Sequence, residues 1–218
     1  MVAAGATRAE MVADRIRQAI RAGVYVSGDR LIELTLAHQM QVSQNTVRDA
    51  LRLLEAEGWV VKQSRHGVYI RTFSREEVIE LYALWAAVES LAVRWAIEQI
   101  SKKDTTHLRR ILANGQREAL AGDLQTAMEA VLEFHTMIGT LSAKPQTEAL
   151  LRSLHNRVSL LEVLRQMRAP RSLRAHEARL MLYEKLVSLM EAGDGDAAEE
   201  LLRYLIRTEG ESLISLIE

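Results

Sequence analysis

Hydrophobic residues recur at helical spacing over most of the chain and at strand spacing over one short region. Near the start, Val12, Ile16 and Ile20 lie on one stripe of a helix that Gly23 ends. Three helices and two β-rich runs are expected in the first third of the chain, over about 9–22, 34–40, 44–57, 59–63 and 67–70. The two β-rich runs flank a short turn and predict a hairpin.

The pattern changes after Thr72-Phe73-Ser74, because every later segment has the helical period. Helices are expected there over about 75–100, 103–121, 123–141, 146–168, 172–192 and 196–217. The predicted fold is therefore mainly α. Residues 1–72 would form a winged helix-turn-helix of three helices and a two-stranded wing, and residues 75–218 an antiparallel all-α bundle of six to seven helices.

Residues that start and stop helices support these boundaries. Ser43 is a good N-cap for the helix at 44–57. Ser101 and Asp104 are spaced as in a capping box. Gly122-Asp123 and Gly193-Asp194 read as a helix stop followed by a cap, and Pro145 and Pro170 fall at helix starts, where a missing N–H is tolerated.

The helix at 44–57 sorts into an apolar and a polar side. At 100° per residue the apolar side holds Val47, Ala50, Leu51 and Leu54. The polar side holds Asn45, Arg48, Asp49 and Arg52, with Gln44 and Thr46 at its margins. Amide and guanidinium groups near a helix N-terminus are what a reader of the DNA major groove needs. A solvated amphipathic surface is the alternative reading of the same side chains.

His66 and Gly67 lie at the tip of the predicted hairpin. A glycine there would let the backbone approach a phosphate or the minor groove closely. An ordinary hairpin-turn glycine and an exposed loop histidine explain the same two residues equally well.

Composition narrows the class of protein. The 218 residues contain no Cys, which excludes disulfides, thiolate zinc sites and cysteine nucleophiles. The formal net charge of −1 hides a basic start, since residues 1–72 carry +3 and the remainder −4. The longest apolar run, 81–88, is too short to span a bilayer, and residues 1–10 lack the features of a secretory signal. We expect a cytoplasmic protein with no membrane association.

A family resemblance rests on residues spaced from the first helix to the wing. They are Ser27-Gly28-Asp29-Arg30-Leu31, Leu36-Ala37, the run 42–51, Leu54-Glu55, Glu57-Gly58-Trp59-Val60 and His66-Gly67-Val68. This pattern resembles the GntR superfamily of bacterial transcription regulators. The stretch 74–96, with Glu89, Ala92 and Ala96, is similar to the start of the FCD-type effector domain in the FadR-like branch. The resemblance implies operator contacts for Gln44, Asn45, Thr46, Arg48, Arg52, His66 and Gly67.

Four positions depart from the family pattern in the DNA-binding part. Ser27 replaces a common Pro, Gln41 a Gly, Gln44 an Arg and Thr46 a Pro. Gln41 would be strained if the turn needs positive φ. A Gln at position 44 suits adenine where an Arg would suit guanine. We expect a changed operator sequence with DNA binding retained.

FCD domains usually hold a divalent metal with an Asp and three His, and the resemblance places three of these four positions on other residues. His135 matches, whereas Val131, Tyr183 and Leu205 stand at the other three, and Trp85 replaces a frequent Arg. One ligand of four cannot hold zinc, and adding His176 leaves a poor site. We therefore expect no metal or other cofactor. The predicted effector-binding residues are Trp85, Val131, His135, His176, Tyr183 and Leu205, which favour an apolar or aromatic effector. The alternative is that these side chains fill the cavity.

The combined prediction is a homodimeric regulator, a repressor, whose affinity for a palindromic operator changes when a small molecule binds the helical domain. An effector-independent DNA-binding and dimerisation protein is one alternative. The other is a metal-dependent hydrolase using His135, His155 and His176 with Glu133 or Glu177. The chain has no HExxH, GxSxG or phosphate-loop motif, so we expect no enzyme. His155, followed by Asn156 and Arg157, is expected to face solvent.

Overall fold

The computed structural model describes residues 6–64, 66–168 and 172–217. These residues group into two compact units. The first comprises the chain up to Phe73 together with 156–167, and the second comprises 74–155 and the chain from Arg168 onward. The change of unit after Phe73 lies where the sequence pattern changes. The assignment of 156–167 to the first unit differs from the single continuous helical domain expected from residue 75.

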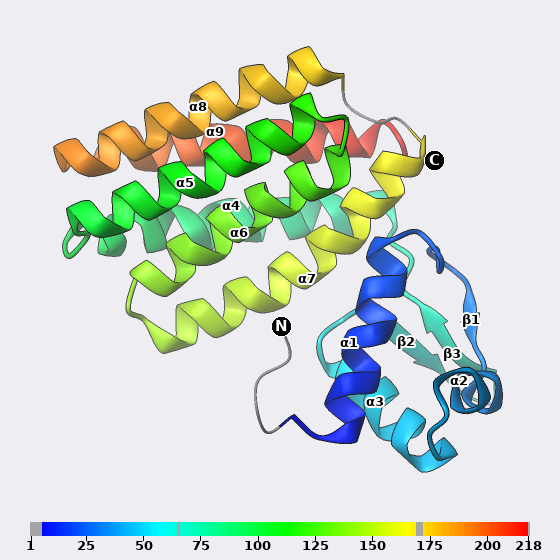
Figure 1. Ribbon diagram of the computed structural model, residues 1–218. Helices are drawn as coiled ribbons and strands as arrows, with labels where there is room; N and C mark the ends of the chain where they lie inside the picture. Colours follow the sequence, from blue (N-terminus) through cyan, green and yellow to red (C-terminus); the bar gives the residue numbers. More distant parts are fainter. Residues whose placement is uncertain (1–5, 65, 169–171, 218) are drawn as a thin grey trace. The chain divides into compact units, whose positions relative to one another are not determined.

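The first unit contains three helices and a small sheet (Figure 1). In chain order its elements are α1 (Arg8–Arg21), β1 (Arg30–Leu31), α2 (Glu33–Met40), α3 (Gln44–Ala56), β2 (Val60–Gln63) and β3 (Gly67–Ile70). The predicted helix-turn-helix and the predicted hairpin are confirmed. The sheet has three antiparallel strands in the order β1-β3-β2 among the described residues, which corrects the two-stranded wing. The two residues of β1 are too few to give a periodic signal.

Apolar residues from every helix of this unit form its core. Val47, Ala50, Leu51 and Leu54 of α3 are all buried, as the helical projection predicts. They pack in one cluster with residues of α1, α2 and the sheet, among them Ile16, Leu36 and Ile70, and with Trp59, which directly precedes β2. This packing fixes which side of α3 remains outside.

The turn between α2 and α3 contains Gln41 in the left-handed region, with φ 56° and ψ 44°. The strain expected from a residue other than glycine at this position is therefore present. Ser43 then caps α3, since its side chain accepts a hydrogen bond from the N–H of Thr46. The turn sets the direction of α3.

The second unit is built from long helices. They are α4 (Arg75–Ile97), α5 (Lys102–Leu120), α6 (Leu124–Leu141), α7 (Pro145–Arg168), α8 (Leu173–Ala192) and α9 (Gly195–Ile214). α4 packs most extensively against α9, and α5 packs against α6 and α8 (Figure 1). The six predicted helices are confirmed to within a few residues at each end.

Helix caps follow the sequence signals. Ser101 and Asp104 form the expected capping box, and Asp123 and Asp194 cap α6 and α9. Pro145 begins α7, whereas Pro170 lies outside the described residues. Leu173, the first residue of α8, is 38% exposed.

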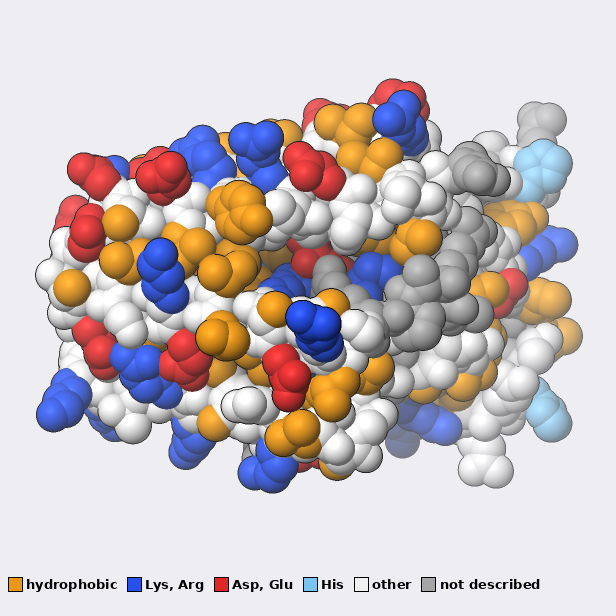
Figure 2. Space-filling model, turned by 90° about the horizontal axis from the view of Figure 1, so that it is seen from above, with side chains coloured by type: hydrophobic (Ala, Val, Ile, Leu, Met, Phe, Trp, Pro, Cys, Tyr) orange, Lys and Arg blue, Asp and Glu red, His pale blue; other side chains and the backbone are white. Residues whose placement is uncertain are grey.

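The outer surface of the helical unit is strongly charged. On the face seen in Figure 2, Lys and Arg side chains lie among Asp and Glu side chains, with hydrophobic groups between them. Arg109 of α5, for example, pairs with Glu184 and Glu191 of α8. None of the helices within the described residues is long and apolar enough to cross a membrane.

Candidate functional sites

The first candidate site is the exposed side of α3. Gln44, Asn45, Arg48 and Arg52 are exposed and Thr46 is partly exposed, while the opposite side of the helix is buried. Arg52 pairs with Asp49 at 3.1 Å, and the Oγ1 of Thr46 lies 2.8 Å from the Oγ of Ser43. The α3 residues predicted to contact DNA therefore share one accessible surface.

Two side chains of this surface are held by a carboxylate on α2. The Nε and Nη2 of Arg48 donate to Glu33 at 3.3 and 2.8 Å, and the Nε2 of Gln44 donates to the same carboxylate at 3.0 Å. The hydrogen bond from Arg48 lowers the pKa of Glu33, so this carboxyl group is ionised at neutral pH. Glu33 was not among the predicted site residues, because nothing in the local pattern indicates a partner 15 residues along the chain.

The wing residues lie at the turn between β2 and β3. His66 is exposed, and its carbonyl oxygen accepts a hydrogen bond from the hydroxyl of Tyr69. Gly67 has φ 112°, and a Cβ there would lie 3.1 Å from the Nε of Arg30. The backbone conformation therefore requires glycine at position 67, independently of any DNA contact.

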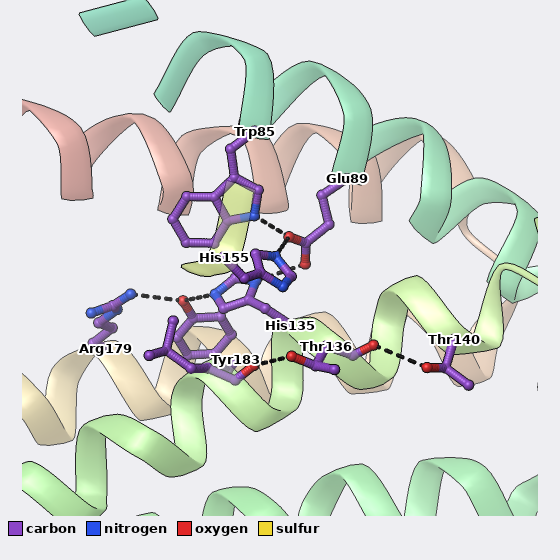
Figure 3. Close-up of polar contacts among 9 residues, drawn as sticks. Trp85, Glu89, His135, Thr136, Thr140, His155, Arg179 and Tyr183 are labelled. Atoms are coloured by element: carbon purple, nitrogen blue, oxygen red, sulfur yellow. Dashed lines mark hydrogen bonds and ion pairs between the residues drawn. The ribbon is translucent and has the colours of Figure 1, made fainter. Parts of the chain in front are cut away.

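The second candidate site is a polar cluster buried in the helical unit (Figure 3). Glu89 of α4 is fully buried at its centre. Its carboxylate lies 2.7 Å from the Nδ1 of His135 and 3.2 Å from the Nε2 of His155, and it also accepts the indole N–H of Trp85. Three donors thus converge on one carboxylate from α4, α6 and α7.

The hydrogen bonds continue from His135 to α8 and α9. The Nε2 of His135 lies 2.7 Å from the hydroxyl of Tyr183, which accepts a hydrogen bond from Arg179 at 3.0 Å. Arg179 also forms a 2.7 Å ion pair with Glu209. Five helices therefore contribute side chains to one connected set, named here the Glu89 cluster: Trp85, Glu89, His135, His155, Arg179, Tyr183 and Glu209.

Protonation in the Glu89 cluster follows from burial and hydrogen bonding. Burial opposes ionisation of Glu89, but the contacts with His135 and His155 outweigh it and lower the pKa of this carboxyl to about 2. Burial lowers the pKa of His135, so its ring is neutral and donates through Nδ1. Burial raises the pKa of Tyr183 to about 12, so the phenol keeps its proton and donates to the Nε2 of His135.

Of the six predicted effector-site residues, the structure brings Trp85, His135 and Tyr183 into direct contact. The ring centroid of His135 lies 4.7 Å from that of Trp85 and 5.3 Å from that of Tyr183. The remaining three, Val131, His176 and Leu205, are buried in the same unit. The expectation that His155 faces solvent is wrong: its side chain is 7% exposed.

Glu89, His155 and Arg179 were not among the predicted site residues. A signal existed for the first two, because Glu89 shares a helical stripe with Val78, Tyr82 and Trp85, all of them buried. His155 lies one turn after Leu151, also buried. Arg179 gives no such signal, since its ion-pair partner Glu209 is brought to it only by the packing of α8 against α9. Among the described residues, no group of three or more His, Cys, Asp or Glu side chains is arranged to hold a metal ion.

Comparison with known proteins identifies both parts of the chain. The family model for bacterial regulatory proteins of the gntR family matches residues 8–70, and the FCD domain model matches residues 80–208. The Nta operon transcriptional regulator of Aminobacter aminovorans is 30% identical over 133 residues, which cover 60% of this chain and 62% of that protein. The HTH-type transcriptional regulator YdhC of Bacillus subtilis is 26% identical over 152 residues, 69% of this chain and 68% of that one.

Solved structures share the fold along nearly the whole chain. A transcriptional regulator, GntR, from Rhodococcus sp. RHA1 superposes with a TM-score of 0.81, covering 96% of this chain and 99% of the other at 24% sequence identity. The shared fold therefore covers both units of this chain.

Proposed function

The chain belongs to the GntR family of bacterial regulatory proteins and carries an FCD domain, and we propose that it acts as a repressor that binds a palindromic operator as a homodimer. It is a DNA-binding transcription regulator and not an enzyme. Such a regulator works in the bacterial cytoplasm, where its operator is.

The observation that carries the proposal is the division of α3 into two sides. Its apolar side is buried in the first unit, so packing fixes the helix, and Gln44, Asn45 and Arg48 project outward near its N-terminus. This arrangement presents amide and guanidinium groups to base edges of a major groove. The wing residues His66 and Gly67 add a contact to the adjacent backbone or minor groove.

The test is selection of duplexes from a random-sequence pool by the full chain at fixed salt. Enrichment of a two-fold symmetric motif with half-sites about one helical turn apart supports the proposal. Binding that shows no sequence preference at any salt concentration contradicts it.

Homodimer formation is supported by α4. Leu84 and Leu91, seven residues apart, are 48% and 45% exposed on this helix, and Ala87 between them is also exposed. A second copy of the chain is the occupant that a palindromic operator requires. Replacing both leucines by Glu is expected to shift the mass measured by light scattering from dimer to monomer, while Met181→Glu, at an exposed side chain of α8, leaves it unchanged.

The effector we propose is apolar or aromatic and lacks a carboxylate. The Glu89 cluster contains two buried carboxylates, Glu89 and Glu209, and one guanidinium, that of Arg179, which pairs with Glu209, so the cluster is electrostatically unfavourable for an organic acid. Thermal-shift screening with aromatic compounds, amines and citrate tests this. Stabilisation by citrate contradicts the proposed class, and no stabilisation by any compound favours the alternative in which side chains fill the space and the unit only dimerises.

We also propose that the helical unit needs no metal. The buried carboxylate of Glu89 is already paired with two buried imidazoles, since it lies within hydrogen-bonding distance of both His135 and His155. A chelator is expected to leave the melting temperature unchanged. Stabilisation by Zn²⁺ that disappears in His135→Gln would contradict this proposal.

A further inference from the structure

The carboxylate of Glu33 connects two side chains of α3, Gln44 and Arg48, whose hydrogen-bonding groups suit different bases. α2 packs against α3 (Figure 1), and this packing brings the Glu33 carboxylate to both Gln44 and Arg48. Glu33 is itself partly buried, whereas the two side chains that it binds are exposed. The Glu33 carboxylate is therefore more restricted in its motion than the side chains of Gln44 and Arg48 that it binds.

The hydrogen-bonding groups of Arg48 and Gln44 that bind Glu33 are not the ones needed to contact a base. Glu33 takes the Nε–H of Arg48 and one N–H of its Nη2, and the Oδ1 of Asn45 accepts one N–H of Nη1 at 3.4 Å, which leaves one N–H on each Nη. These two N–H groups suffice for a bidentate contact with guanine O6 and N7. Glu33 takes one N–H of Gln44, which leaves the carbonyl oxygen and the second N–H, the pair that adenine requires.

Resting on the proposed DNA-binding function, we propose that Glu33 is a positioning residue for operator specificity. It holds the side chains of Gln44 and Arg48 in fixed positions. The conformational entropy of these two long side chains is therefore lost when the protein folds and not when it binds DNA. As an anion beside the DNA-reading surface, it also weakens binding to phosphate wherever the matching bases are absent. Both effects raise the ratio of operator affinity to non-specific affinity.

The test measures this ratio with two duplexes of equal length and composition. One is the duplex selected by the wild-type chain from a random pool, and the other has the same bases in shuffled order. Dissociation constants are measured at several salt concentrations for the full-length wild type, Glu33→Gln and Glu33→Asp. The control is Glu57→Gln, which removes the same charge and breaks the 2.8 Å ion pair with Arg17 in the same unit.

Glu33→Gln is expected to raise affinity for the shuffled duplex several-fold and to lower the affinity ratio about tenfold, a step typical of losing one bidentate contact. Glu33→Asp keeps the charge but is one methylene too short to bind both partners. It is expected to leave the shuffled-duplex affinity unchanged and still lower the ratio. Glu57→Gln is expected to change the ratio less than twofold.

Two results would overturn the inference. If Glu33→Gln raises affinity for both duplexes by the same factor, the residue contributes only its charge. If it lowers both affinities equally together with the melting temperature, its role is structural. A wild-type chain that enriches no duplex at all instead contradicts the proposed function, so the two failures are distinguishable.

Discussion

His135 and Glu89, 46 residues apart in the sequence, meet at 2.7 Å with both side chains fully buried. The carboxylate is ionised and the ring donates to it, so a charge is stabilised in the interior by hydrogen bonds and not by water. Removing its donors or its charge changes the stability of the whole helical unit.

Glu89→Gln is expected to reduce the free energy of unfolding and to remove part of its dependence on pH. The pKa of Glu89 is lowered in the folded state to about 2 from the ordinary 4.5, so its contribution is fully present above pH 4.5 and is lost as pH falls toward 2. At neutral pH the contribution is up to about 3 kcal/mol. Denaturant titrations of wild type and variant from pH 7 to pH 3 should show two stabilities that converge in acid.

Glu191→Gln serves as the control for that measurement. Glu191 also has a lowered pKa, caused by hydrogen bonds from Thr105 and Arg109, but its side chain is 41% exposed. Its substitution is expected to have little effect at any pH. A pH-independent gap between Glu89→Gln and wild type would show that Glu89 is not ionised in the folded protein.

Arg48→Ala is expected to weaken operator binding by roughly 1–3 kcal/mol, because an arginine that reads a base contributes about that much. Gel-shift titrations at fixed salt measure the change. Arg207→Ala removes an equal charge from an exposed site on α9 and is expected to leave the affinity unchanged. Equal losses for both variants would mean that only the total charge matters.

Gln41→Gly is expected to be more stable than Gln41→Ala by up to about 1 kcal/mol. Position 41 has positive φ, which an L side chain adopts only with strain and glycine adopts freely. Equilibrium unfolding of both variants gives the difference directly. If alanine proves the more stable residue, the turn between α2 and α3 does not hold this conformation in solution.

Gly210→Ala is expected to destabilise the chain by about 1–3 kcal/mol, because a Cβ at this position would lie 2.7 Å from the Cγ of Tyr82 where α9 packs on α4. Gly195→Ala on the same helix has nothing within 4 Å of the added carbon and is expected to be tolerated. Thermal unfolding of the two variants side by side checks the contrast. Equal melting temperatures would contradict the close packing at Gly210.

The fold was largely predictable because helices of this length carry their own signals. Ser43, Ser101 and Asp194 mark starts, and the apolar stripe of α3 marks the buried side, so local sequence was sufficient. β1 was missed because two residues form a strand only through pairing with β3. The assignment of residues 156–167 to the first unit likewise depends on contacts that no local pattern records.

The candidate sites were predictable in position but not in connectivity. Trp85, His135 and Tyr183 were named from the sequence, and the structure brings them together. Their partners were missed for a physical reason. A buried polar residue such as His155 resembles an exposed one when only its chain neighbours are considered. Glu33 comes within hydrogen-bonding distance of Arg48 only because α2 and α3 pack together in the fold.

Because five helices meet in the Glu89 cluster, its members are expected to evolve as a set. A carboxylate lost at position 89 would leave two imidazoles and an indole with donors and no acceptor, so the next viable sequence needs compensating exchanges on α6 and α7 at once. Relatives whose residues differ in the Glu89 cluster should therefore differ at several of its positions at once. Single replacements at these positions should be rare among functional chains.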